Sequence, residues 1–194
     1  MSEVALWWIG TGDADNGLLE SVRTHVEQVF RAPARLELAG SGPDDAFDAR
    51  RNQHSSHRTL LWLESRRPRR AARILGLTDA DLFIPVLTFV FGEAQLKGRA
   101  AVVSTARLIG AGLPGESARL GRRLRTEAVH ELGHTFGLLH CRDSRCAMAR
   151  SSTLKDVDAK LPDLCETCRA LFLENADEIG DFHEQEEHAD PADR

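Results

Sequence analysis

The sequence predicts an α/β (α+β) fold, in which helices pack against a β-sheet. Three observations support this prediction: a strand–helix–strand pattern opens the chain, further β-rich runs follow, and a long helical pattern comes after them. The 194 residues are enough for one domain with its own core and short for two. With 42% hydrophobic and 28% charged residues, the composition is typical of a globular protein rather than a disordered one.

The first third of the chain contains short apolar runs separated by helical patterns. Val4–Ile9 is apolar and predicts the first strand. In Asn16–Phe30 the apolar residues recur with a helical period, and Pro33 follows the predicted helix. Arg35–Ala39 alternates as a strand does, and a second helical stretch is expected from about Asn52 to Glu64.

The middle of the chain is rich in β-forming residues. Phe83–Gly92 and Ala100–Thr105 predict a hairpin with its turn near Lys97. A helical pattern begins at about Glu116, and one more short helix is expected after Cys168. These elements place a single domain in residues 1–172.

The remaining residues, 173–194, are acidic and contain little apolar surface, which predicts a disordered tail. The net charge of −5 argues against a nucleic-acid partner. No apolar run approaches the roughly 18 residues of a membrane helix, and Met1–Gly10 lacks the basic start of a signal peptide. We therefore expect a cytoplasmic protein without a membrane or nucleic-acid partner; the sequence does not indicate its oligomeric state.

One segment carries a metal-binding pattern, HExxHxxGxxH, from His130 to His140. His130 and His134 are four residues apart, so on a helix their imidazoles lie on one face and share a metal ion. Glu131 is rotated away from that pair and lies beside the metal, where a general base acts on a water molecule. A chance match to five specified positions is the competing interpretation, and the length of the pattern argues against it.

The third histidine requires the helix to end. If the helix continued, His140 would lie roughly 9 Å further along the axis and on the wrong side. Gly137 provides the end, because glycine readily adopts the left-handed conformation that turns the chain. Three neutral imidazoles leave an open position for water, as in a catalytic zinc site.

Four cysteines follow directly, with the spacing C-x4-C and then C-x2-C: Cys141, Cys146, Cys165 and Cys168. This spacing predicts a second, structural zinc held by four thiolates. Two disulfides or a C-x-x-C redox pair are the alternatives, and a reducing compartment argues against them. Because His140 and Cys141 are adjacent, the two zinc ions must be neighbours, and loss of the structural zinc should displace His140.

With these motifs the sequence resembles the archaemetzincins. The resemblance rests on HExxHxxGxxHC, on Cys146-Ala147-Met148 and on the final C-x-x-C. Leu87–Ala94 matches as well, and Arg50–Gln53 is a fainter match. It implies a metzincin-like zincin domain with a mixed, twisted sheet, a catalytic helix and a lower part around the second zinc. It also implies that Phe89–Ala94 borders the cleft, where a peptide adds as a further strand. Met148 would form a turn beneath the metal.

The predicted function is that of a zinc-dependent peptidase with two Zn²⁺ ions and a peptide or protein substrate. Glu131 would take a proton from a zinc-activated water and pass it to the leaving amine. Several metzincins resemble one another in using a tyrosine to stabilise the oxyanion, but this chain has no tyrosine. The zinc itself or another donor, which the sequence does not identify, would take that task. The enzyme would be an endopeptidase or an aminopeptidase. Glu93 is a candidate anchor for a free amine, although an ordinary exposed strand residue is the favoured interpretation of it. The alternative is a two-zinc scaffold that binds a peptide or protein partner, against which the intact Glu131 argues.

Overall fold

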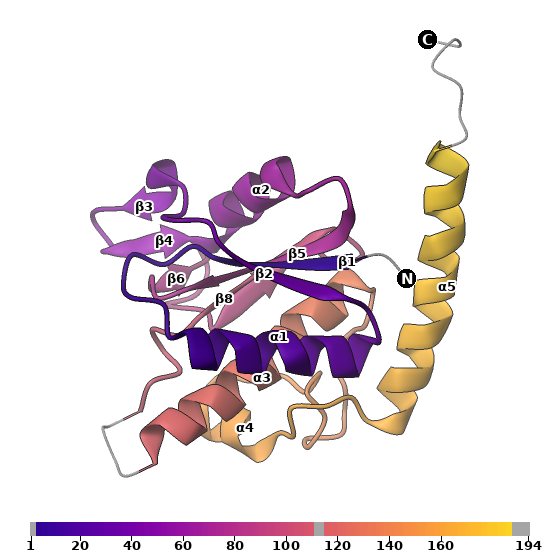
Figure 1. The fold of residues 1–194 in the computed structure, drawn as a ribbon. Coiled ribbons are helices and arrows are strands. Elements are labelled where there is room, and N and C mark those ends of the chain that lie inside the picture. Colours follow the sequence, from indigo (N-terminus) through magenta and orange to yellow (C-terminus); the bar gives the residue numbers. More distant parts are fainter. Residues whose placement is uncertain (1–2, 111–114, 188–194) are drawn as a thin grey trace.

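The protein, described by a computed structural model over residues 3–110 and 115–187, is built on a mixed five-stranded sheet (Figure 1). The strand order is β2-β1-β5-β8-β7. Four strands are parallel, and the edge strand β7 runs antiparallel to β8. The strands are β1 (Glu3–Trp8), β2 (Ala34–Leu38), β5 (Ala71–Thr78), β7 (Gly92–Ala94) and β8 (Ala100–Ser104).

Helices cover both faces of this sheet (Figure 1). On one face lie α1 (Asn16–Phe30) and α3 (Glu116–Thr135), which contact each other, and on the other lies α2 (Ser56–Arg66). Beyond α3, the shorter α4 (Leu154–Ala159) lies in the lower part of the molecule, and α5 (Glu166–Glu187) begins there and runs up along one side. The predicted α/β (α+β) fold with a mixed sheet is therefore confirmed.

A second, three-stranded sheet lies beside the main one, with the order β3-β4-β6. It consists of β3 (Phe47–Asp48), β4 (Gln53–Ser55) and β6 (Leu82–Phe83), and a 3-10 turn, Asp44–Ala46, precedes it. β4 leads directly into α2, whose first turn is capped by the Ser55 side chain.

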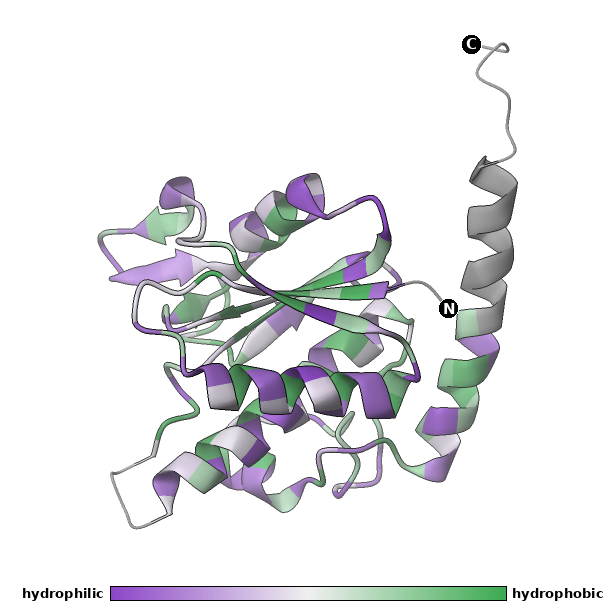
Figure 2. Cartoon of the chain, in the orientation of Figure 1, coloured by the Kyte–Doolittle hydropathy of each residue, from purple (hydrophilic) through white to green (hydrophobic). Residues whose placement is uncertain are grey.

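The core follows from the apolar periodicity of these elements. Along α1 the buried residues include Leu19, Val22, Val26 and Val29, a helical spacing that places them on one side. Hydrophobic and hydrophilic segments accordingly alternate along this helix (Figure 2). At the far end of the core the rings of Phe30, Phe136 and Phe172 pack together, with centroids 5.0–5.3 Å apart. This aromatic cluster joins α1, the end of α3 and the start of α5, so it fixes the lower part of the molecule against the sheet.

The structure confirms the first strand, the first helix and the second strand, and it corrects three other expectations. The helix expected from Asn52 begins at Ser56, because Gln53–Ser55 pairs as β4. Only the ends of Phe83–Gly92 are extended: Phe83 ends β6, Gly92 begins β7, and an irregular loop lies between them. Ala71–Thr78, for which no element is predicted, forms β5, in the centre of the sheet.

The end of the chain also differs from the expected disordered tail. α5 continues to Glu187, so residues 173–187 are helical, which agrees with the good helix-forming alanine and glutamate residues they contain. Residues 188–194 of the expected tail lie outside the described residues, and a domain boundary at residue 172 stays a prediction. Among the described helices, none combines the length and the apolar character needed to cross a membrane.

Candidate active site

The three histidines of the sequence pattern converge at the end of α3. His130 and His134 lie one turn apart, with their Nε2 atoms 3.1 Å apart. The His140 ring lies 5.3 Å from the His130 ring and 5.0 Å from the His134 ring, centroid to centroid. One ring nitrogen from each histidine falls within 4.8 Å of the others, which is the arrangement of a three-imidazole metal site.

The helix ends where the sequence predicts. Gly137 has φ of 85°, and its N–H donates to the carbonyl of His134 at 2.9 Å. The Leu138 N–H donates to the carbonyl of Gly133 at 3.0 Å, so the last turn closes on itself. A Cβ at position 137 would also lie 3.1 Å from the side chains of Lys97 and Asn175. The left-handed turn at Gly137 reverses the chain and returns His140 to the other two rings.

The hydrogen bonds of His130 and His134 give both side chains an orientation that suits a cation. Nδ1 of His130 lies 2.8 Å from the carbonyl of Ala147, and Nδ1 of His134 lies 2.7 Å from that of Leu138. Because a carbonyl only accepts, each Nδ1 carries the proton and each Nε2 presents a lone pair. Burial lowers the pKa of both histidines, so they are neutral near pH 7. Two lone pairs that face each other at 3.1 Å repel unless a metal ion lies between them.

Glu131 lies beside this triplet, in a buried position against the edge strand. A Cβ built at Gly92 of β7 would lie 2.8 Å from Oε1 of Glu131 and 2.7 Å from its Cγ, so only a glycine leaves room for the carboxylate. Burial raises the pKa of Glu131 well above its usual value, and the nearby carboxylates of Glu127 and Glu93 add to the rise. A raised pKa suits a group that must accept a proton and later release it.

Met148 is completely buried and packs against α3 between the first two histidines. A side chain at Gly133 would overlap its sulfur, so the close approach depends on that glycine. The carbonyl of Ala147, beside Met148, is the one that accepts from His130. The segment from Cys146 to Ala149 thus forms a floor under the histidine triplet.

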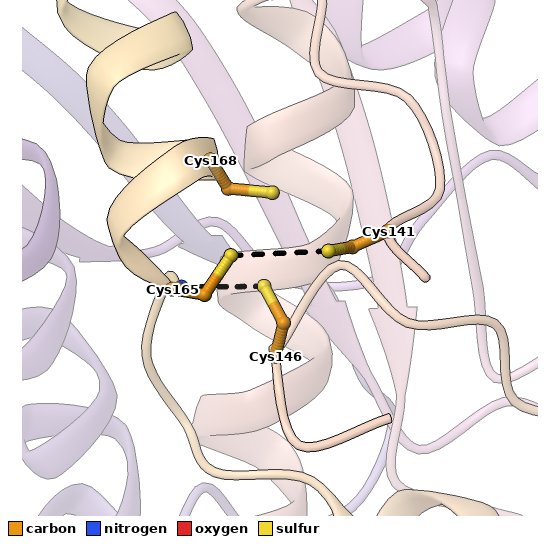
Figure 3. Close-up of side chains that lie close together, drawn as sticks. All are labelled: Cys141, Cys146, Cys165 and Cys168. Atoms are coloured by element: carbon orange, nitrogen blue, oxygen red, sulfur yellow. Dashed lines mark hydrogen bonds between the residues drawn. The ribbon is translucent and has the colours of Figure 1, made fainter. Parts of the chain in front are cut away.

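The four cysteines form a second cluster, with their sulfurs turned toward one another (Figure 3). Cys165 directly precedes α5 and Cys168 lies in its first turn, whereas Cys141 and Cys146 come from the loop after the histidines. The sulfurs of Cys141 and Cys165 are 3.8 Å apart, and all four lie within 4.8 Å. A tetrahedron with Zn–S bonds of about 2.3 Å has edges of about 3.8 Å, so the cluster fits zinc. All four cysteines are free thiols rather than disulfides.

The two clusters share one loop. The Cys141 N–H donates to the carbonyl of Met148 at 2.9 Å, and Cys141 forms an isolated parallel bridge with Ala149. The loop that carries two cysteines therefore also carries His140 and the carbonyl bonded to His130.

Sequence reasoning missed three residues of the site. Gly92 makes room for Glu131, and the only hint in the sequence is the family resemblance, which places Phe89–Ala94 beside the cleft. Glu127 and Lys160 form a buried ion pair beside His130, with 3% and 1% of their side chains exposed. Lys160 lies 30 residues after His130 in a polar segment, so no spacing rule links it to the motif.

The fold and the histidine triplet with its adjacent glutamate define a zinc metallopeptidase of the metzincin type. Comparison with known proteins agrees: the model of peptidase family M54 matches residues 69–174. An archaemetzincin of Methanopyrus kandleri is 44% identical over 160 residues, 82% of this chain and 89% of that protein. An archaemetzincin of Natronomonas pharaonis is 38% identical over 170 residues, 85% of this chain and 97% of that protein. The chain belongs to peptidase family M54.

Solved structures support the same assignment. The crystal structure of the Methanopyrus kandleri archaemetzincin superimposes with a TM-score of 0.81 at 34% identity, covering 91% of this chain and 96% of that one. A zinc-dependent peptidase from Methanocorpusculum labreanum gives a TM-score of 0.78 at 29% identity, covering 87% and 99%. The resemblance to the archaemetzincins stated from the sequence motifs is confirmed.

Proposed function

We propose that this peptidase hydrolyses peptide bonds with a zinc ion held by His130, His134 and His140 and with Glu131 as its general base. The observation that carries the proposal is the 3.1 Å distance between Nε2 of His130 and Nε2 of His134, whose lone pairs face each other, with Glu131 buried beside them. We further propose a second, structural zinc on the four cysteines, whose sulfur separations match a tetrahedral site.

The protein groups divide the chemistry between them. Zinc, when bound, supplies a Lewis acid that activates a water molecule and polarises the scissile carbonyl. The Glu131 carboxylate takes the proton from that water and delivers it to the leaving amine. Its packing against Gly92 limits the positions that the carboxylate can occupy, so little reorientation is needed between the two proton transfers.

The free edge of β7 is the place for an extended substrate. The Phe91 carbonyl accepts from the Ser104 N–H, and the Gln95 N–H donates to the Ala100 carbonyl, so both groups point toward β8. By the alternation of an antiparallel ladder, the backbone N–H and C=O groups of Gly92 and Ala94 point to the free edge. A peptide bound there as another strand would pass beside Glu131, which contacts Gly92.

The orientation of Glu93 favours cleavage within a chain over removal of an N-terminal residue. Glu93 follows Gly92 in β7, so its side chain lies on the opposite face from Glu131. There it accepts a hydrogen bond from the Ser56 hydroxyl of α2. A carboxylate held in this way is poorly placed to bind a substrate amine at the cleft. We therefore propose an endopeptidase first and an aminopeptidase as the second candidate.

The test is cleavage of a mixed peptide library by the zinc-loaded protein, read by mass spectrometry, next to Glu131→Ala and Glu93→Gln. We expect internal cuts by the wild type and by Glu93→Gln, and no cuts by Glu131→Ala, although all three proteins bind zinc. Stepwise N-terminal trimming that Glu93→Gln loses would instead establish the aminopeptidase. If the zinc-loaded wild type cuts nothing, a two-zinc scaffold that binds a peptide or protein partner takes the place of the peptidase proposal.

A further inference from the structure

Lys160, at the end of α4, is a fully buried lysine with an unusual set of partners. Its Nζ donates to the carbonyl of Ala147 at 3.2 Å and to the carbonyl of Ala149 at 3.1 Å. The same Nζ lies 2.8 Å from Oε1 of Glu127 in α3. The ammonium thus has two carbonyl acceptors and one carboxylate as its ion-pair partner, and all three belong to segments around the histidine triplet.

The two carbonyls lie on either side of Met148, so one ammonium holds both ends of the floor under the metal site. The Ala147 carbonyl is also the acceptor for Nδ1 of His130, at 2.8 Å. Lys160 and His130 therefore bond to the same oxygen atom. Any shift of that carbonyl changes the direction in which His130 presents Nε2 to the metal.

Glu127 completes the connection from within the helix itself. It lies three residues before His130 and four before Glu131, hence on the same side of α3. Through Lys160, the helix that carries two histidines is tied to the loop that carries His140 and Met148. Burying a lysine and a glutamate is expensive, and an apolar pair of similar volume would serve stability as well or better. This cost points to a role beyond stability.

We propose that Lys160 and Glu127 are positioning residues for the catalytic zinc, acting through the Ala147 carbonyl on the orientation of His130. This inference rests on the assignment of zinc to the histidine triplet, not on peptide cleavage. Groups that hold a metal-ligating histidine in place typically change metal affinity or activity by about 10–100-fold when they are removed.

The decisive variant replaces both charges at once, Glu127→Leu with Lys160→Met. Because one positive and one negative charge disappear together, the net charge beside the metal is unchanged. The variant therefore isolates the effect of the pair on the position of the Ala147 carbonyl and of His130. Lys160→Met alone leaves a buried carboxylate without its partner and serves as the destabilised reference. Lys155→Met removes an exposed lysine from the same short helix and is the matched control.

The measurements are the melting temperature, the affinity of the histidine site for zinc and the kcat and KM of the zinc-saturated protein. Zinc affinity is determined by competition with a chelating dye, on protein that retains its cysteine-bound zinc. We expect Lys160→Met to melt well below the wild type and the double variant to recover most of that loss. The double variant should still bind zinc about 10–100-fold more weakly and have a lower kcat with little change in KM, whereas Lys155→Met should match the wild type.

A double variant with wild-type stability, zinc affinity and kcat would overturn the proposal and leave the pair a structural one. If the double variant does not fold, Glu127→Met with Lys160→Leu provides the same test with a different apolar volume. The zinc measurement is independent of the peptidase proposal, because it needs no substrate. A protein that cuts no peptide but loses zinc affinity in the double variant supports the positioning role and contradicts only the proposed reaction.

Discussion

Replacing Gly92 by alanine should impair catalysis without removing zinc. The added methyl group would lie 2.7 Å from Cγ of Glu131, 2.8 Å from its Oε1 and 2.6 Å from the Val102 carbonyl. Ordinary contacts of a Cβ begin near 3.4 Å, so the neighbours must separate by about 0.6–0.8 Å. Val102 lies in β8, which is paired on both sides, so the displacement falls on the Glu131 carboxylate and on the edge strand.

The size of the effect follows from the geometry of proton transfer. A general base contributes about 10²–10⁴-fold, and a misplacement of about 1 Å costs about 10²-fold. We therefore expect kcat to fall by about 30–100-fold, with zinc content unchanged because no histidine is touched. Overpacking should also lower the free energy of unfolding by about 1–3 kcal/mol.

The assay is kcat and KM on a peptide that the wild type cuts, with zinc content measured on the same samples. Gly121→Ala on α3 is the matched control, because a Cβ there meets its neighbours at an ordinary 3.6 Å. As a glycine-to-alanine change within a helix, it should keep full activity and gain about 0.5–1 kcal/mol of stability. A Gly92→Ala protein with the kcat of the wild type would refute the close contact and the confined position of Glu131.

Three further predictions follow from the site and its surroundings. Cys165→Ser should lower zinc content by more than one equivalent, measured by elemental analysis; loss of one equivalent alone would contradict the coupling to His140. Gly137→Ala, at φ of 85° and with little space, should cost at least about 1 kcal/mol of stability and weaken zinc binding at the histidines, seen by thermal melting and zinc titration. Asp158 forms an ion pair with Arg123 through two hydrogen bonds, and this contact lowers the pKa of the aspartate. The ion pair therefore stabilises the fold above about pH 4, and this stabilisation is lost as the pH falls through the lowered pKa. Asp158→Asn should lower the melting temperature by about 2–4 °C at pH 7, and the difference from the wild type should shrink toward pH 3; a constant difference would exclude the charge effect.

Much of the fold could be predicted from local patterns, and the failures have physical causes. The helical period of Asn16–Phe30 matches α1 residue for residue, because one face of that helix is buried and the other is not. In β5, by contrast, six consecutive residues from Arg73 to Thr78 are buried. A parallel strand in the centre of a sheet is covered on both faces, so it lacks the alternation that identifies a strand. Arg73 further disguises this strand, since it is a buried arginine that packs its guanidinium over the ring of Phe136.

The candidate site shows the same division between local and long-range information. The histidines and Glu131 lie within 11 residues, where helix geometry and one glycine turn determine their arrangement, so the motif sufficed to predict it. Gly92 lies 38 residues before the motif and Lys160 lies 20 residues after it. The family resemblance places the segment of Gly92 at the cleft but does not indicate what the glycine itself does, and no local pattern relates Lys160 to the motif. Their roles depend on how a β-strand and a short helix pack against α3, which only the three-dimensional structure provides.

The adjacency of His140 and Cys141 has a structural meaning beyond their order in the chain. The loop from His140 to Ala149 is closed by the bond between the Cys141 N–H and the Met148 carbonyl, and it has no regular secondary structure of its own. A loop of this kind keeps its shape only if other contacts determine it. Here two of its residues belong to the cysteine cluster, and its other end is bonded to Lys160 and to His130. Zinc on the cysteines would therefore stabilise the position of His140 directly and that of His130 through the Ala147 carbonyl. For this reason, loss of the cysteine-bound zinc is expected to release the zinc at the histidines as well.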